Sequence, residues 1–201
     1  MKYFIIIATF FIFMGCTQSD QTTSDSAGIQ NNATASDPFI YEPIAGADVQ
    51  KVILKNRDGK IREQGFMLNG KRTGMWLIFE KSDVFPHKII SYQNDMYNGP
   101  YFEFTERGQM TMKANYMNNK LDGYFARYKF SKEVVTANYD NGKLTGEYRE
   151  YDERKNFLTK IENYKDDQLH GKVQYYNADG IVIMEYEYKN GKKVSGGMIN
   201  Q

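Results

Sequence analysis

A short sequence pattern recurs six times in this chain and constrains its fold more than any other feature. Each copy opens with a large apolar residue, has Asn or Asp two positions later, and continues directly with Gly, Asn or Asp. The openers are 23 to 25 residues apart: Met67, Tyr92, Tyr116, Tyr139, Tyr164 and Tyr188. A period of this length is typical of repeat architectures, in which each unit packs mainly on its neighbours.

The paired polar residues of each copy predict β-hairpin turns. Both central positions of a type I′ turn need a positive φ, which Gly, Asn and Asp adopt at low cost. Every copy keeps these residue types: Asn69-Gly70, Asn94-Asp95, Asn118-Asn119, Asn141-Gly142, Asp166-Asp167 and Asn190-Gly191. In this register each opener faces the residue five positions later across two antiparallel strands. Apolar residues alternate with others ahead of the openers, as over 110–116, which indicates half-buried strands.

In five copies a glycine stands seven positions after the opener, on the same strand face as the opener in this register. The five structural repeat glycines are Gly74, Gly99, Gly123, Gly146 and Gly171, and Ser195 takes this place in the sixth copy. A glycine inside a strand often marks close approach by another group, and we expect an aromatic ring of the neighbouring repeat there. No long helical pattern is evident after residue 39. We therefore predict an all-β fold, an elongated open antiparallel meander of repeated hairpins.

Aromatic or apolar residues follow each glycine at two and at five positions. A spacing of three puts the two members on opposite faces of a regular strand, unless a bulge re-aims one of them; the sequence leaves both alternatives open. The first members recur at repeat spacing and are expected to line up as a stripe: Trp76, Tyr101, Phe125 and Tyr148. This stripe either packs the repeats together or, if exposed, is a candidate binding surface for sugar rings or a partner protein.

The N-terminal part of the chain has a different composition. Residues 1–15 hold one lysine and a short apolar run, which is typical of a secretory signal peptide and is too short for a transmembrane helix. Cys16, the only cysteine, follows directly and resembles the lipidated cysteine of bacterial lipoproteins. The polar composition of 16–38 predicts a disordered tether. Residues 39–201 are then the β-hairpin repeat domain, with clear repeats over 67–188.

Charge and motifs exclude several functions. Without residues 1–15, which hold one lysine and no acid, the chain has 25 basic and 25 acidic residues. It therefore lacks the basic surface that nucleic-acid binding requires. The two histidines, His87 and His170, do not fit a metal-ligand spacing, and no nucleophile elbow or phosphate-binding loop is present. We expect no catalytic residue, cofactor or metal, and interpret the acidic cluster over 147–153 as a solvated charged surface.

The stretches 139–148 and 164–171 resemble the variant MORN (membrane occupation and recognition nexus) repeat, and the resemblance covers about residues 67–188. This repeat recurs in YwqK-type antitoxins and in many bacterial lipoproteins without an assigned role. The resemblance implies a β-repeat scaffold without catalytic residues. Together with Cys16 it predicts a non-enzymatic lipoprotein, anchored to a membrane of the cell envelope through its N-terminal lipid and binding a protein partner. An antitoxin or immunity role and a glycan-binding module are the alternatives.

Overall fold

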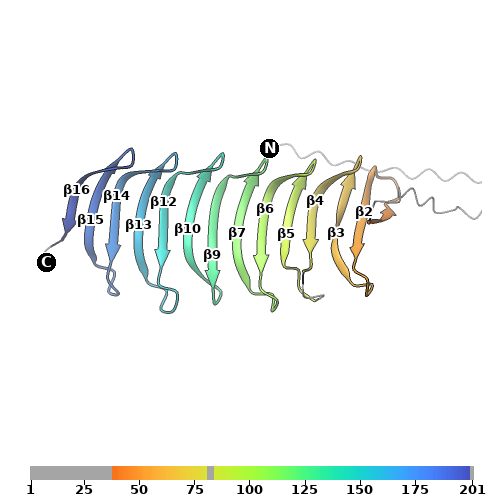
Figure 1. Ribbon diagram of the computed structural model, residues 1–201, viewed down its shortest axis with the longest axis horizontal. Helices are drawn as coiled ribbons and strands as arrows, with labels where there is room; N and C mark the ends of the chain where they lie inside the picture. Colours follow the sequence, from red (N-terminus) through yellow and green to blue (C-terminus); the bar gives the residue numbers. More distant parts are fainter. Residues whose placement is uncertain (1–37, 81–83, 200–201) are drawn as a thin grey trace, which may run out of the picture. The chain divides into compact units, whose positions relative to one another are not determined.

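The computed structural model describes residues 38–80 and 84–199, which form one antiparallel β-sheet (Figure 1). Within these residues no helix is present, and so none is available to cross a membrane. The predicted signal peptide, Cys16 and nearly all of the predicted tether lie outside the described residues. The strands are β1 (Ile40–Pro43), β2 (Val49–Lys55), β3 (Ile61–Leu68), β4 (Lys71–Ile78), β5 (Lys88–Gln93), β6 (Met96–Phe104), β7 (Met110–Met117), β8 (Lys120–Leu121), β9 (Gly123–Lys129), β10 (Lys132–Asp140), β11 (Lys143–Leu144), β12 (Gly146–Tyr151), β13 (Leu158–Lys165), β14 (Gln168–Tyr176), β15 (Val182–Lys189) and β16 (Lys192–Met198).

The strands follow one another across the sheet in chain order, and β1 and β16 are its two edges. The short strands β8 and β11 pair only with β7 and β10. Because the two edges do not pair with each other, the sheet is open. The predicted all-β meander of hairpins is confirmed.

All six predicted repeat turns are present in the predicted conformation. Both central residues of every turn have φ between 49° and 89°, as a type I′ turn requires. Each opener pairs with the residue five positions later, as in the pairs Tyr92–Tyr97 and Tyr139–Leu144. The repeat turns line one long side of the sheet, and the remaining connections line the other (Figure 1). We call the second set the distal turns.

Glycine is required at the repeat positions for a different reason from the one expected. Each pairs with the opener of the next copy, as Gly146 does with Tyr164, but a Cβ built on Gly123 or Gly146 would have no atom within 4 Å. At Gly99 and Gly171 the nearest atom would be the Cβ of Ser91 or Asn163, and only Gly74 would have a ring atom within 4 Å, Cδ2 of Phe66 at 3.8 Å. The expected ring is therefore absent at four of the five glycines. All five glycines have a positive φ, between 64° and 107°, and this backbone conformation is what a side chain would strain.

Substitutions at Gly146 separate these two reasons. Gly146→Val is expected to cost about 1–3 kcal/mol of unfolding free energy, because a β-branched residue is strained at positive φ. Gly146→Asn is expected to cost less than about 1 kcal/mol, because Asn adopts this conformation. Chemical denaturation of both variants measures the difference. A similar loss in both would point back to a packing contact at this position.

Hydrogen bonds between neighbouring repeat turns add a connection that the repeat pattern alone does not predict. The second turn residue of one copy donates its N–H to a carbonyl of the preceding copy, that of the residue paired with the opener. Asp167, for example, donates to the Leu144 carbonyl at 3.0 Å. Where the second turn residue is Asp or Asn, its side chain accepts the N–H of that same residue. The bond from the Leu144 N–H to Asp167 Oδ1 is 2.8 Å long, and Asp95 and Asn119 make equivalent bonds.

Three copies have Gly at the second turn position, and the two of them that follow another copy use a different side chain instead. Before Gly142, Asp122 of the preceding copy accepts the N–H of Asn141 at 3.1 Å. Before Gly191, the Nδ1 atom of His170 lies 3.2 Å from Asn190 Oδ1. Where the second turn residue is Gly, a residue of the preceding copy thus makes a different polar contact with the turn. His170 is one of the residues that make such a contact.

The strand ends next to the distal turns contain β-bulges. The ladder register shifts between Glu103 and Phe104, between Glu150 and Tyr151, and between Tyr175 and Tyr176. These are the positions of the second aromatic in three copies. Of the two alternatives left open by the sequence, the bulge is the one that the structure adopts there.

The hydrophobic core lies on one face of the sheet, which we call the front face. Aromatic rings meet edge to face along it, and the ring centroids of Trp76 and Tyr92 are 6.0 Å apart. Pairs of this geometry add to the free energy gained from burial alone. The buried core residues are Val52, Met67, Trp76, Ile90, Tyr92, Tyr101, Ala114, Phe125 and Ala137.

Candidate functional site

The predicted aromatic stripe forms, but it belongs to the core. Trp76 pairs with Ile90, and Ile90 in turn pairs with Tyr101, so the members lie in one row across the front face. Trp76, Tyr101 and Phe125 are 0%, 6% and 9% exposed, and Tyr148 is half-buried against the same core. Three of the four rings are therefore inaccessible to a ligand. As a candidate binding stripe this prediction is wrong, and packing between repeats is its role.

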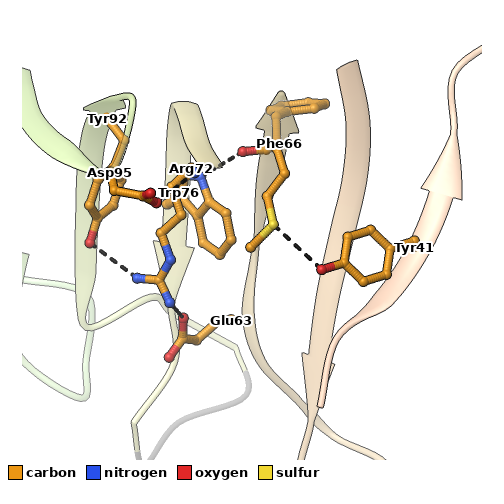
Figure 2. Close-up of polar contacts among 8 residues, drawn as sticks. Tyr41, Glu63, Phe66, Arg72, Trp76, Tyr92 and Asp95 are labelled. Carbon is orange, nitrogen blue, oxygen red and sulfur yellow. Dashed lines mark hydrogen bonds and ion pairs between the residues drawn. The ribbon is translucent and has the colours of Figure 1, made fainter. Parts of the chain in front are cut away.

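Figure 2 shows how Trp76 is held at the N-terminal end of the front face. Its indole Nε1 donates a hydrogen bond to the Phe66 carbonyl at 3.1 Å. The Arg72 guanidinium lies 4.4 Å from the ring centroid and donates to the Tyr92 hydroxyl and to the Glu63 carboxylate, at 3.2 and 2.9 Å. The charge of Arg72 is thus balanced by Glu63 and stacked on an aromatic face.

A close backbone approach does occur on this face, at a glycine outside the repeat set. A Cβ built on Gly65 would lie 2.3 Å from Cδ2 of Trp76, so the indole ring packs directly over the Gly65 backbone. The sequence pattern assigned this kind of contact to the repeat glycines. Gly65 lies two residues before the opener Met67 and was not singled out.

The phenol groups of the front face are protonated and take part in hydrogen bonds, in which Tyr92 accepts from Arg72 and Tyr101 donates to Glu103. Burial raises the pKa of Tyr92 to about 12, and the bond from Arg72 opposes this effect. Burial, and then the hydrogen bond to Glu103 at 2.6 Å, raises the pKa of Tyr101 further. Both hydroxyls therefore keep their protons at neutral pH. They supply packing and hydrogen bonds rather than acid–base chemistry.

The opposite face, which we call the back face, carries a second row of cross-strand neighbours. Leu77 pairs with Ile89, and Ile89 pairs with Phe102, so three apolar side chains are adjacent across β4, β5 and β6. Phe66 and Met75 lie on the same face of β3 and β4. We define the back-face patch as these five residues: Phe66, Met75, Leu77, Ile89 and Phe102.

The back-face patch contains a shallow groove and is accessible. The groove has a volume of about 220 Å³ and is lined mainly by apolar atoms. Met75 is 54% exposed, and it is informative because it lies next to other apolar side chains in a groove rather than alone. The lining residues are Lys51, Gln64, Gly65, Phe66, Met75 and Leu77.

The same back-face row is polar at the other end of the sheet. Arg149 pairs with Ile161, which pairs with Gln174, and Gln174 pairs with Glu185. Lys172 and Glu185 form an ion pair at 3.0 Å. The C-terminal part of this row is therefore mainly polar, with Ile161 as its apolar member, whereas the row is apolar at Leu77, Ile89 and Phe102.

The sequence does contain a signal for the back-face patch, although the repeat pattern hides it. Adjacent apolar residues such as Ile89-Ile90 and Tyr101-Phe102 place one side chain on each face of a strand. Such pairs also occur in later copies, as at Val134-Val135 and Tyr175-Tyr176, so this signal alone does not locate the patch. They indicate a sheet segment that is apolar on both faces.

The described residues contain no group of three His, Cys, Asp or Glu side chains placed to hold a metal ion. His87 lies 3.6 Å from Glu80, and His170 faces Asn190.

A scan against models of known protein families found no match, and a search of curated proteins found none either. The relation to MORN repeats therefore stays a prediction that rests on the repeat residues themselves.

Proposed function

We propose that this protein is a non-enzymatic interaction scaffold of the cell envelope, in which the back-face patch binds a protein partner. The observation that carries the proposal is the accessible apolar groove around Met75, on the sheet face that does not hold the core. A lipid on Cys16 would keep the scaffold at a membrane. The MORN-like repeats agree with a binding role and supply no catalytic residue.

An antiparallel sheet needs only one apolar face in order to fold, because its other face can be solvated. The front face fulfils this need here. The apolar side chains of the back-face patch therefore require a separate reason. Contiguous exposed apolar surface next to a polar surround is typical of protein interaction sites. Methionine suits such a site, because its flexible thioether adapts to the shape of a partner.

Lysine and glutamate border the groove on β2 and β1. Lys51 lines the groove and forms an ion pair with Glu42 at 2.8 Å. A partner that inserts an apolar side chain between Phe66 and Met75 would thus meet a polar rim. This arrangement resembles the core and rim of known protein interfaces.

Met75→Asp tests the proposal with little effect on the fold. Because Met75 is more than half exposed, we expect its substitution to change the unfolding free energy by about 0.5 kcal/mol or less. An aspartate in an apolar interface is expected to reduce partner recovery about thirtyfold, which corresponds to the loss of a hot-spot residue. Quantitative co-purification with the full-length membrane-localised chain measures this reduction, and Lys172→Asp on the polar part of the back face is the control. Equal recovery with both variants would contradict the proposal.

A further inference from the structure

A second cavity lies beside the distal turns in the middle of the sheet. It has a volume of about 340 Å³ and is lined by Lys132, Glu133, Tyr151 and Asn156. The ladder between β10 and β12 runs only as far as the pair Val135–Glu150. Beyond this pair the two strands end in different connections, a tight turn at 130–131 and a wider loop over 152–157. We call the space between them the β10–β12 notch.

The two connections that border this notch have left-handed backbone conformations, and one of them places a bulky residue in such a conformation. Outside the repeat turns, three described non-glycine residues have a positive φ: Phe130 at 51°, Ser131 at 61° and Asn156 at 62°. All three belong to the two connections that border the notch. A bulky residue such as Phe is a rare outlier at this φ. The Phe130 ring is 71% exposed, so its burial does not offset the strain, and uncompensated strain of this kind is typical of functional sites.

The notch also holds an unpaired hydrogen-bond acceptor. The side-chain oxygen of Asn156 is buried and has no hydrogen-bond partner among the described residues. A buried polar atom without a partner is costly. A ligand with an O–H or N–H group would supply the missing donor.

Glu133 is a second acceptor and is held in place by two phenols. The hydroxyls of Tyr124 and Tyr128 both donate to its Oε1 atom, at 2.8 and 3.0 Å, which leaves Oε2 for a ligand. Burial, and then the bond to Glu133, raises the pKa of Tyr128 to about 12. The phenol therefore remains a donor, and the carboxylate keeps its orientation.

Charge balance in the notch favours a neutral ligand. The lining holds one cation, Lys132, and one anion, Glu133, while Lys129 and Glu153 pair with each other across the two connections. An anionic ligand would meet Glu133 and a cationic one Lys132. One hydroxyl group can donate to Asn156 or to Glu133 and can also accept from Lys132, so two hydroxyl groups satisfy both acceptors.

These observations together point to a polyhydroxylated ligand. We propose that the β10–β12 notch binds a neutral sugar residue, whose hydroxyl groups bond Asn156 Oδ1 and Glu133 Oε2 and whose apolar ring face packs on Tyr151, the aromatic residue of the lining. The notch volume of about 340 Å³ lies within the range of small-ligand sites. This site is separate from the back-face patch and from the buried front-face stripe, and it does not depend on the proposed protein partner.

Calorimetric titration of the full chain with three neutral oligosaccharides tests the proposal: triacetylchitotriose, maltotriose and xylotriose. We expect at least one of them to bind with a dissociation constant on the order of 1 mM or lower, and glucuronate and glucosamine to bind more weakly. Asn156→Gly keeps the positive φ and removes the amide, so binding should fall at least tenfold while the melting temperature stays equal or rises. Asn69→Gly, at a repeat turn with φ 52°, is the matched control and should leave binding unchanged.

A second variant tests the site independently of Asn156. Tyr151→Leu keeps an apolar side chain in the lining and removes its aromatic ring. Oligosaccharide binding should weaken because the ring on which the sugar packs is lost. The proposal is overturned if no neutral oligosaccharide binds the unmodified chain, if a charged sugar binds better, or if binding survives unchanged in both variants.

Discussion

Gly65→Ala is expected to lower the unfolding free energy by about 3 kcal/mol, which is at the upper end for overpacking a core. The added Cβ would lie 2.3 Å from Cδ2 and 2.5 Å from Cε2 of Trp76. The clash involves the rigid body of an indole ring that is fully buried. The ring or the β3 backbone would therefore have to move. Because φ of Gly65 is not positive, steric overlap rather than backbone strain is the cause.

Gly197→Ala is the matched control for this substitution. Gly197 also lies in a strand without a positive φ, and a Cβ built on it would have no atom within 4 Å. We expect a change within about 0.5 kcal/mol, because Gly197 is only half-buried and the added methyl group meets no other atom. Urea denaturation of the two variants measures the difference. Comparable losses would show that the Trp76 ring does not limit the space at Gly65.

Trp76→Ala is the substitution with the largest expected loss, about 3–5 kcal/mol. The side chain is 0% exposed, and its removal opens a cavity in the front-face core. The ring contacts with Phe39 and Tyr92, at centroid distances of 5.9 and 6.0 Å, are lost with it. The Arg72 guanidinium also loses the aromatic face on which it stacks. The measurement is again the unfolding free energy from denaturant titration.

The double variant of Gly65 and Trp76 tests whether the two residues act as one contact. In a chain with Trp76→Ala, the methyl group of Gly65→Ala enters the space left by the ring and should cost little. The double variant is therefore expected to be about 2 kcal/mol more stable than the sum of the single losses implies. Additive losses would mean that Gly65→Ala destabilises the sheet through a contact other than the one with Trp76.

The turn chemistry accounts for most of what could be predicted about the fold. Asn, Asp and Gly at two adjacent positions strongly favour a type I′ hairpin turn. Their sixfold repetition determines the hairpin register and hence the order of the strands. Tyr139 and Leu144 pair as predicted because the two-residue turn between them leaves one register. Strand existence and topology therefore followed from local chemistry.

The reason for each glycine could not be predicted in the same way. Positive φ and close approach both select glycine, and a sequence does not distinguish them. At Gly146 the positive φ requires glycine, whereas at Gly65 the neighbouring Trp76 ring leaves no space for a side chain. This second contact depends on the bulge in the ladder between β3 and β4.

The sequence also did not determine whether the aromatic stripe is buried or exposed. Alternation shows which residues share a face, but the burial of that face depends on how the rings of neighbouring repeats interlock. Trp76 is fully buried because Phe39, Arg72 and Tyr92 surround it. The β10–β12 notch was missed for a related reason. Nothing in the local sequence shows that the pairing between β10 and β12 ends at Val135 and Glu150.

The back-face patch is proposed to hold a protein partner. Placing a photo-crosslinking amino acid at Met75 of the full-length chain in its native cell tests this claim most directly, with the same amino acid at Lys172 as the control. Both positions are exposed on the back face, but only Met75 lies in the apolar patch. We predict one discrete protein adduct at Met75 that is absent at Lys172. Equal labelling at both positions, or no adduct at Met75, would contradict the claim.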